Sequence, residues 1–247
     1  MGGVRARIFS IICLSLVFTI FISTDCFPWG GGVHRYMSEE AAMVMPEYIR
    51  RILNIHMYSL KEGTLDPDMK RLEDHQNVAQ CAGMIGSYAK KAEKMIKKGR
   101  DWEKIAFTLG QAAHYIQDLN QPQHCSTYET PDEHKSFEHL AVYGHWQREM
   151  YDGFHYIKNY RKFASNTARF SVRYVKYTTR SDLLRDYEFY CKFITPIWAH
   201  AVNDTADLWL AIFRNGLSEE KYKELSLPET VGVRGHKRIK YPKIKDL

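Results

Sequence analysis

The chain has 247 residues, of which 45% are hydrophobic and 26% charged, and its formal net charge is +6. This composition is that of an ordinary globular protein and excludes a disordered, collagen-like or coiled-coil chain. At this length we expect one domain rather than two. The mild positive charge favours anionic partners but does not distinguish a membrane from a nucleic acid.

The first 28 residues have the pattern of a secretory signal. Arg5 and Arg7 precede an uncharged apolar stretch over residues 8–24, and Asp25 ends it. A basic start followed by an apolar segment of this size is typical of a signal peptide. An uncleaved membrane anchor is the alternative, although the stretch is at the short limit for a bilayer span of about 20 residues. We therefore expect residues 1–28 to be removed and the mature protein to be secreted or held in the cell envelope.

Cysteine usage gives little structural information. The predicted mature chain keeps Cys81, Cys125 and Cys191. Three cysteines can form one disulfide at most, so they do not make a disulfide framework.

Helical periodicity dominates the mature chain. Pro46 and Pro196 suit the first position of a helix, and Asp101 is a typical N-cap. Gly63, Asp66 and Pro67 instead indicate a loop. No alternating run of Val, Ile and Thr competes with this interpretation. The predicted helices cover residues 34–45, 46–58, 77–98, 102–119, 134–151, 156–178, 182–194 and 196–216, with loops at 59–74 and 120–132.

We therefore predict an all-α fold, a single compact multi-helix domain over residues 29–216. Residues 217–247 are predicted to be a polar, basic C-terminal tail, because from Pro228 onward six Lys or Arg residues face two acidic ones. A solvated tail and an electrostatic contact with anionic lipid both agree with this pattern.

Candidate metal ligands are concentrated in one region of the sequence. His114 and Asp118 are four positions apart on a predicted helix, and His134 and Glu138 repeat this spacing on the next helix. Residues four apart share a helix face, so each pair presents its imidazole and carboxylate in the same direction. His124 lies in the loop between them. Nitrogen and oxygen ligands of this kind suit Zn²⁺, and the pattern predicts a metal site.

Two weaker elements precede this region. Pro67-Asp68 is followed by His75, and Trp29 is followed by three glycines and then His34. The remaining histidines lack comparable spacing and are expected to be surface or packing residues; they are His56, His139, His145, His155, His200 and His236.

Taken together, these residues resemble the motif of the secreted bacterial zinc-dependent phospholipase C family, which shares its all-α trinuclear zinc core with the fungal single-strand nucleases. The family pattern runs W…H…PD…H…H-x3-D-x5-H…H-x3-E. This sequence has a residue of the required type at every ligand position, in the same order: Trp29, His34, Asp68, His75, His114, Asp118, His124, His134 and Glu138.

The resemblance implies a buried site for three zinc ions. One ion would be held by Asp68, His75, His114 and Asp118. Asp68 would in addition orient or deprotonate the water molecule that attacks phosphorus, and zinc would activate that water.

The other two ions would have separate ligands. The resemblance assigns one to His124, His134 and Glu138. It assigns the other to His34, Asp118 and the amine and carbonyl of Trp29 as the mature N-terminus. Asp118 would therefore bridge two metals, and removal of residues 1–28 would be part of the chemistry.

The sequence departs from the phosphatidylcholine-cleaving members near the substrate headgroup. Those enzymes have a longer interval between the N-terminal Trp and the first His, whereas Trp29 and His34 are five positions apart here. The residue after Asp68 is Met69, where those enzymes have an aromatic residue. The resemblance therefore does not imply a choline pocket.

Three functions agree with the sequence to different degrees. The favoured one is a phospholipase C that acts on phospholipids at a membrane surface and releases diacylglycerol. The alternative is a zinc-dependent single-strand nuclease or nucleotidase, which the short interval from Trp29 to His34 favours. The interval from His124 to His134, together with Glu138 in place of Asp, favours the lipase. A non-catalytic membrane-surface protein is the third, and the complete set of ligand positions argues against it.

Overall fold

The computed structural model describes residues 30–70, 77–126, 137, 141, 150–178 and 187–227, with side chains in the last range described from residue 194 onward. Within these ranges every regular element is a helix, which confirms the all-α prediction. None of the described helices is long and apolar enough to cross a lipid bilayer.

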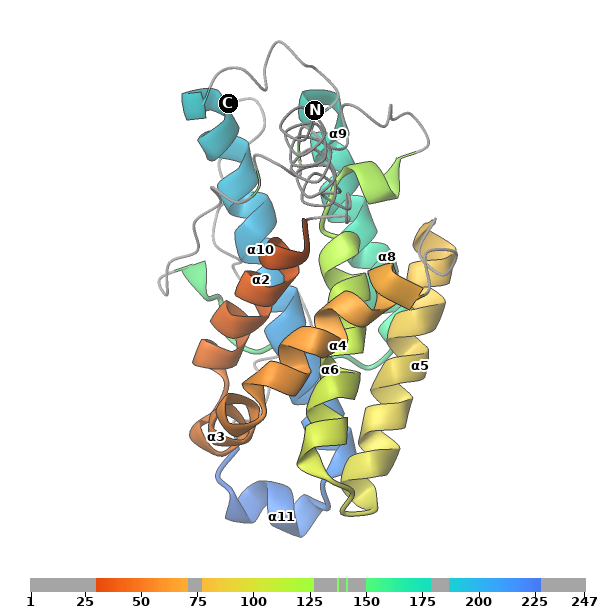
Figure 1. Cartoon of the computed structure of the whole chain (residues 1–247), viewed down its shortest axis with the longest axis vertical. Helices are drawn as coiled ribbons and strands as arrows, with labels where there is room; N and C mark the ends of the chain where they lie inside the picture. Colours follow the sequence, from red (N-terminus) through yellow and green to blue (C-terminus); the bar gives the residue numbers. More distant parts are fainter. Residues whose placement is uncertain are drawn as a thin grey trace, which may run out of the picture.

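Figure 1 shows the elements coloured in chain order, from α2 to α11. Within the described residues, the 3-10 segments η2 (Gln123–Cys125) and η4 (Val172–Tyr174) lie between α-helices. The α-helices are α2 (Gly30–Val44), α3 (Glu47–Ile55), α4 (Met57–Lys70), α5 (Val78–Lys97), α6 (Trp102–Asp118), α8 (Tyr160–Ser171), α9 (Val175–Thr178), α10 (Tyr187–Gly216) and α11 (Glu219–Glu224).

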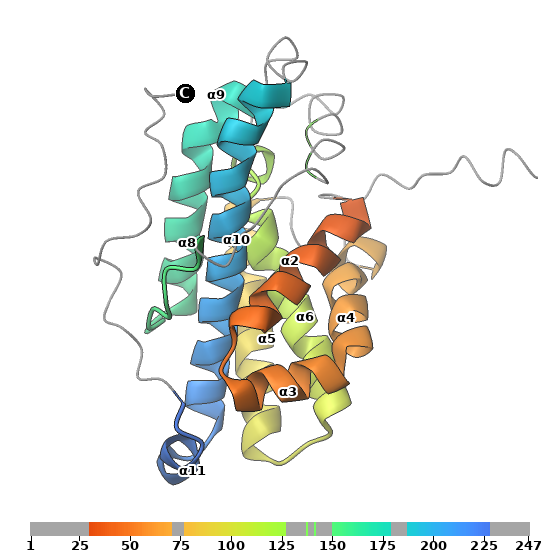
Figure 2. The ribbon, with the colours of Figure 1, turned by 90° about the vertical axis from the view of Figure 1, so that its left-hand side faces the viewer.

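Helix α6 is central to the packing. Helices α2, α4, α5 and α10 all contact it, and α4 crosses it in the view of Figure 1. Helix α5 in turn packs against α8 and α10, and α2 packs against α4 and α10 (Figure 2). From Leu109 onward every side chain of α6 is buried, because neighbouring helices cover all of its sides.

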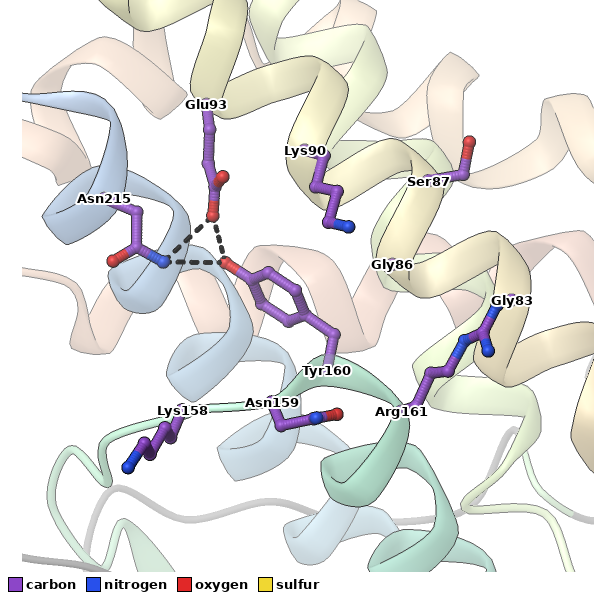
Figure 3. Close-up of a pocket in the computed structure, with 10 residues that line it drawn as sticks. All are labelled: Gly83, Gly86, Ser87, Lys90, Glu93, Lys158, Asn159, Tyr160, Arg161 and Asn215. Atoms are coloured by element: carbon purple, nitrogen blue, oxygen red, sulfur yellow. Dashed lines mark hydrogen bonds between the residues drawn. The ribbon is translucent and has the colours of Figure 1, made fainter.

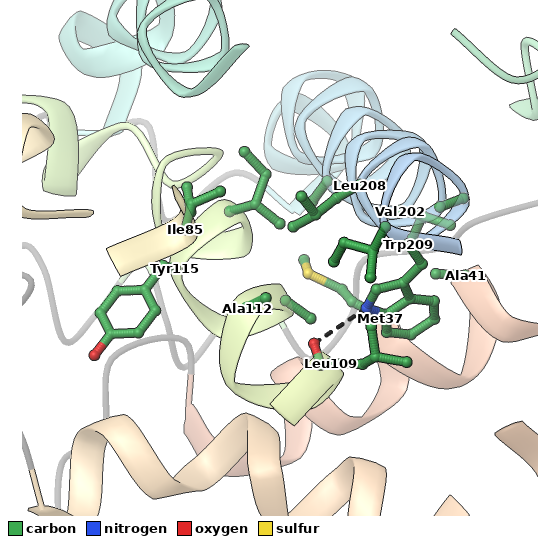
Figure 4. Close-up of a cluster of buried hydrophobic side chains, with 14 of the residues drawn as sticks. Met37, Ala41, Ile85, Leu109, Ala112, Tyr115, Val202, Leu208 and Trp209 are labelled. Atoms are coloured by element: carbon green, nitrogen blue, oxygen red, sulfur yellow. Dashed lines mark hydrogen bonds between the residues drawn. The ribbon is translucent and has the colours of Figure 1, made fainter. Parts of the chain in front are cut away.

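The main hydrophobic core lies between α2, α6 and α10. Figure 4 shows Trp209 of α10 close to Met37 and Ala41 of α2 and to Leu109 of α6. The Trp209 indole Nε1–H donates a hydrogen bond to the Leu109 carbonyl at 3.1 Å, so this large side chain is buried without losing its polar partner. The core therefore fixes the three helices that carry most of the buried polar residues described below.

Local caps mark the starts of two predicted helices, and the predicted N-cap Asp101 is confirmed. The Asn77 side chain accepts a hydrogen bond from the Gln80 amide at the start of α5. The Asp101 side chain likewise accepts one from the Glu103 amide at the start of α6. Each bond satisfies an amide that has no partner within the helix, so these starts depend only on neighbouring residues.

The prediction of a loop at residues 59–74 is wrong over the described part, because α4 is helical as far as Lys70. Gly63 allows the backbones of α4 and α6 to touch: a Cβ atom there would lie 2.1 Å from the Phe107 carbonyl oxygen. Pro67 lies inside the helix and is buried. Burial of this face of α4 against α6 outweighs the local helix-breaking tendency of glycine and proline.

The prediction that Pro196 begins a new helix is wrong, because this residue lies inside α10. Ile194 and Ile197 are fully buried on either side of it. A proline in a helix interior costs about 3 kcal/mol, and the continuous apolar packing of α10 compensates for this cost. The predicted end of the helix at residues 214–216 is confirmed.

Other boundaries differ in smaller ways. Helix α2 begins at Gly30 rather than His34, and Gly31 packs closely on Leu65 of α4. The predicted helix 46–58 is divided at His56 into α3 and the start of α4, and Pro46 is the N-cap of α3. The predicted helix 156–178 consists of α8, η4 and α9. Most of the predicted helix 134–151 lies outside the described residues.

The folded chain continues beyond Gly216. Helix α11 follows Leu217 and Ser218, and the buried Tyr222 ring lies under the Arg214 guanidinium at 4.5 Å. Leu227 is buried as well. Residues 228–247, which contain the basic part of the predicted tail, lie outside the described residues.

Candidate metal centre

Four predicted metal ligands lie together inside the fold and are called the cluster below: His34, Asp68, His114 and Asp118. Two of them lie in the last two turns of α6. His114 and Asp118 share a helix face, as their spacing predicts, and the distance from His114 Nε2 to Asp118 Oδ2 is 3.0 Å. Both side chains are fully buried. This part of α6 therefore presents one imidazole and one carboxylate to the interior.

Helix α2 adds a second imidazole from a distant part of the sequence. His34 is fully buried, and its Nε2 lies 3.4 Å from Asp118 Oδ1. The rings of His34 and His114 are adjacent, with 4.4 Å between their centroids. The two carboxylate oxygens of Asp118 consequently face two different imidazoles.

Helix α4 contributes a second carboxylate. Asp68 is almost completely buried, and its Oδ1 lies 3.5 Å from His114 Nε2. The close contact of α4 with α6 brings Asp68 to this place, and Gly110 permits that contact from the α6 side. A Cβ atom on Gly110 would lie 2.1 Å from the Leu60 carbonyl oxygen.

Hydrogen bonds fix the orientation of both imidazoles. His114 Nδ1 lies 2.8 Å from the Thr64 carbonyl oxygen, to which it can only donate, so its Nε2 carries the lone pair. His34 Nδ1 lies 2.7 Å from Gln117 Oε1. Gln117 Nε2 donates to the hydroxyls of Ser38 and Thr205 at 3.1 and 3.3 Å, which sets the direction of its amide. In its neutral form each histidine therefore directs an Nε2 lone pair at the carboxylates.

The spacing of these donor atoms fits zinc. Two ligands about 2.0–2.1 Å from a tetrahedral zinc ion are about 3.3 Å apart, and the three distances above are 3.0, 3.4 and 3.5 Å. The donor atoms of His34, His114 and Asp118 all lie within 4.8 Å of one another. Within the described part of the chain, His34 Nε2 and the Asp118 oxygens make no hydrogen bond of ordinary geometry. These buried donors are arranged to bind a cation.

The electrostatics of the cluster also favour a cation. Burial alone would raise the pKa of Asp118, but the charges of His114 and His124 outweigh this and hold it well below its usual range. Burial would lower the pKa of His34, whereas Asp118 and Asp68 raise it to about 8. Burial lowers the pKa of His114. A proton is therefore attracted to this site, and a metal ion would compete with it.

The remaining predicted ligands are not all within the described residues. His124 lies in η2, directly after the end of α6, and its charge acts on Asp118. Trp29, His75, His134 and Glu138 fall outside the described residues, so their assignment stays a prediction. The structure brings together the predicted ligands His34, Asp68, His114 and Asp118.

Sequence reasoning missed the residues that orient the cluster and a buried histidine–aspartate pair outside it. Gln117 and Thr64 gave no spacing signal, since a glutamine side chain and a backbone carbonyl belong to no motif. His200 and Asp204 of α10 do repeat the H-x3-D spacing, and His200 Nδ1 lies 3.1 Å from Asp204 Oδ2. Both are buried, and Asp204 accepts a hydrogen bond from Thr167 at 2.5 Å. This spacing could have identified the pair.

Two of the three predicted mature cysteines, Cys81 and Cys125, are not bonded to each other. Cys125 instead has its Sγ 3.3 Å from the Leu119 carbonyl oxygen, to which it donates a hydrogen bond. Burial, with a smaller effect of the Asp118 charge, raises the pKa of Cys125 to about 12, so it stays protonated at neutral pH. The Cys191 side chain lies outside the described residues.

The fold and the site together define a class, an all-helical protein with a buried histidine–aspartate cluster arranged for zinc. Residues 33–225 match the model of the family described as zinc-dependent phospholipase C. The chain therefore belongs to the zinc-dependent phospholipase C family. No curated protein sequence is detectably similar to it.

Solved structures with a similar fold include two clostridial toxins. The alpha-toxin of an avian strain of Clostridium perfringens superposes with a TM-score of 0.56 at 15% identity, over 74% of this chain and 63% of the toxin. The alpha-toxin of Clostridium absonum gives a TM-score of 0.53 at 16% identity, over 76% of this chain and 65% of the toxin. The chain thus spans a little under two thirds of the length of these toxins.

Proposed function

We propose that this protein is a secreted zinc-dependent phospholipase C that hydrolyses the glycerol-side phosphodiester bond of phospholipids at a membrane surface. The products would be diacylglycerol and a phosphorylated headgroup. Family membership supports the reaction class. The observation that carries the proposal is Asp118, whose two oxygens face His34 and His114 at 3.4 and 3.0 Å. A carboxylate placed between two imidazoles in this way is suited to bridge two metal ions.

The proposed site holds three zinc ions. His34, Asp68, His114 and Asp118 would supply the described ligands. When bound, zinc supplies positive charge that neutralises a phosphodiester and promotes ionisation of water. The remaining ligands are proposed from the sequence pattern: His75, His124, His134, Glu138 and the terminal amine and carbonyl of Trp29.

Asp68 is proposed as the general base. Its side chain is buried at the cluster, with Oδ1 3.5 Å from His114 Nε2. A carboxylate there can orient the attacking water and accept its proton. Asp68→Asn should lower turnover by about 10²–10⁴-fold. Much of the zinc should stay, because the amide oxygen can still be a ligand. Loss of zinc and activity together would show that Asp68 is a structural ligand only.

A paired substrate assay tests the proposed reaction. Zinc-loaded protein is incubated with phospholipid vesicles and, in parallel, with single-stranded DNA. Release of diacylglycerol without DNA cleavage is expected. DNA cleavage without diacylglycerol release would contradict the proposal and support the nuclease alternative. Elemental analysis of the same sample should find close to three zinc ions, and one or none would refute the trinuclear site.

Secretion and the start of the mature chain are proposed together. N-terminal sequencing of the secreted protein should begin at Trp29. A protein that begins Met-Trp29 should lose about one zinc ion and most activity, because its terminal amine is displaced. Full activity with Phe27 and Pro28 still attached would show that the Trp29 amine is not a ligand.

A further inference from the structure

A hollow lined by polar and charged residues lies apart from the metal centre. It has a volume of about 590 Å³ and is bounded by α5, the start of α8 and the end of α10 (Figure 3). This volume is within the usual range for small-molecule sites. None of its lining residues belongs to the metal cluster.

The charged side chains that line the hollow are mainly cationic. Lys90 of α5, Lys158 and Arg161 line it, against the single carboxylate of Glu93. Figure 3 shows Lys90 and Arg161 extending into this region from opposite walls, with Lys158 at the outer edge. Within the described residues, none of these three cations forms an ion pair with a carboxylate. Their positive charge is therefore available to a ligand.

Glu93 is already engaged in the wall. Its Oε1 accepts hydrogen bonds from the Tyr160 hydroxyl at 2.5 Å and from Asn215 Nδ2 at 2.9 Å. Burial, together with the Glu93 carboxylate, raises the pKa of Tyr160, which therefore remains a donor. The acid thus joins α5, α8 and α10 and forms no ion pair with the lysines or the arginine, whose three charges leave the lining with a net positive charge.

Two glycines of α5 keep the hollow open. A Cβ atom on Gly83 would meet nothing within 4 Å, and one on Gly86 would only touch Tyr160 Cβ at 4.0 Å. Glycine in a helix interior costs about 1 kcal/mol relative to alanine. At Gly63 and Gly110 close packing of backbones requires this residue, but at Gly83 and Gly86 it does not. What these two glycines provide is space next to the cations.

Neutral donors complete the lining. Asn159 caps α8 through its Oδ1, which accepts from the Lys162 amide, and its Nδ2 donors remain available on the same side chain. Ser87 adds a hydroxyl from α5. Cations accompanied by neutral hydrogen-bond donors match an anion with several oxygen atoms.

We propose that this hollow binds a phosphate group, at a site separate from the metal centre and independent of the phospholipase reaction. The phosphate can belong to an anionic lipid headgroup or to a soluble phosphate ester. Lys90 and Arg161 supply the charge, Asn159 and Ser87 supply neutral hydrogen bonds, and Gly83 leaves room for the ligand.

Amide NMR on zinc-loaded protein tests the site. Inorganic phosphate is titrated at constant ionic strength, and the amide signals of Gly83, Gly86 and Tyr160 are followed, which separates this site from phosphate bound at the metals. A saturable shift of these signals is expected. Lys90→Met and Arg161→Met should each weaken binding by about tenfold, whereas Lys97→Met, an exposed lysine on the same helix outside the hollow, should not.

A steric variant provides an independent test. Gly83→Leu places a side chain into open space, so the protein should fold and keep its zinc content and hydrolytic activity. Its Tyr160 amide should no longer respond to phosphate. Absence of a saturable shift in the wild type, or an unchanged shift in Lys90→Met, Arg161→Met and Gly83→Leu, would overturn the proposal.

Vesicles identify the source of the phosphate. Sedimentation with phosphatidylcholine vesicles, with and without phosphatidic acid, is compared for the wild type and the Lys90→Met/Arg161→Met variant. Loss of phosphatidic acid-dependent binding in the variant supports a lipid headgroup. Unchanged vesicle binding alongside lost phosphate binding supports a soluble phosphate ester. Lack of phospholipid hydrolysis by the wild type would refute the proposed function but not this site.

Discussion

Gln117 makes a sharp test of the metal centre, because it touches a proposed ligand without being one. It is fully buried and accepts from His34 Nδ1 at 2.7 Å while donating to Ser38 and Thr205. Gln117→Met has similar volume but removes the acceptor. His34 would then have a buried N–H without a partner and would lose the bond that selects its tautomer.

The expected size of the effect follows from these contacts. Loss of a hydrogen-bond partner behind a metal-bound histidine lowers metal affinity by about 10–100-fold. That range corresponds to about 1.4–2.7 kcal/mol of binding free energy. An unpaired buried donor also lowers the free energy of unfolding of the metal-free protein, by about 1–3 kcal/mol. Both effects should appear together in Gln117→Met.

Gln117→Glu is the matched variant. Its carboxylate still accepts from His34 Nδ1, and a carboxylate behind a zinc-bound histidine is a common arrangement. The zinc affinity of Gln117→Glu should therefore equal or exceed that of the wild type, even though the metal-free variant is less stable than the metal-free wild type. This opposite response separates an orienting role from simple packing.

Zinc affinity is measured by competition with a chromophoric chelator, and folding is checked by circular dichroism. Nitrogen NMR of the metal-free wild type, at a pH above the His34 pKa of about 8, should report the Nδ1–H tautomer for His34. A folded Gln117→Met protein that binds zinc as tightly as the wild type would show that Gln117 does not orient His34. A loss of zinc affinity in Gln117→Glu equal to that in Gln117→Met would contradict this role as well.

Three further predictions concern the bridging carboxylate, a buried acid and the glycines. Asp118→Asn should lose more zinc than Glu138→Gln in elemental analysis, because Asp118 is proposed to bind two ions; equal losses would contradict bridging. Burial raises the pKa of Glu40 from 4.5 to about 7, so its ionisation as the pH rises destabilises the folded state. In thermal unfolding the stability of Glu40→Gln should therefore rise relative to that of the wild type between about pH 5 and pH 7.5, by about 1–2 kcal/mol after allowance for solvent screening, and a difference independent of pH would count against this. In denaturant unfolding Gly110→Ala should destabilise the protein by about 2–3 kcal/mol through its clash with the Leu60 carbonyl, whereas Gly83→Ala should stabilise it by about 0.5–1 kcal/mol; similar effects of the two changes would refute the packing argument.

The sequence determined the features that depend on neighbouring residues. The cap at Asp101, the amphipathic pattern of the helices and the shared face of His114 and Asp118 all follow from contacts within one or two turns. Such contacts are properties of the helix itself, so periodicity and spacing are enough to predict them.

Where local preferences compete with burial, the tertiary structure decided the outcome. Gly63 and Pro67 favour a loop in isolation, yet α4 is helical because its buried face packs against α6. Pro196 favours a helix start, yet α10 continues through it between Ile194 and Ile197. In both cases the free energy gained by burying a long apolar face exceeds a local cost of a few kcal/mol.

The geometry of the site was also decided by the tertiary structure. The motif named His34 as a ligand, but only the packing of α2 against α6 places its Nε2 beside Asp118. Gln117, 83 positions from His34, orients that imidazole through an amide whose own direction is set by Ser38 and Thr205. These hydrogen bonds join residues on three packed helices, α2, α6 and α10. Such contacts follow no sequence period, so they form only once the helices are in place.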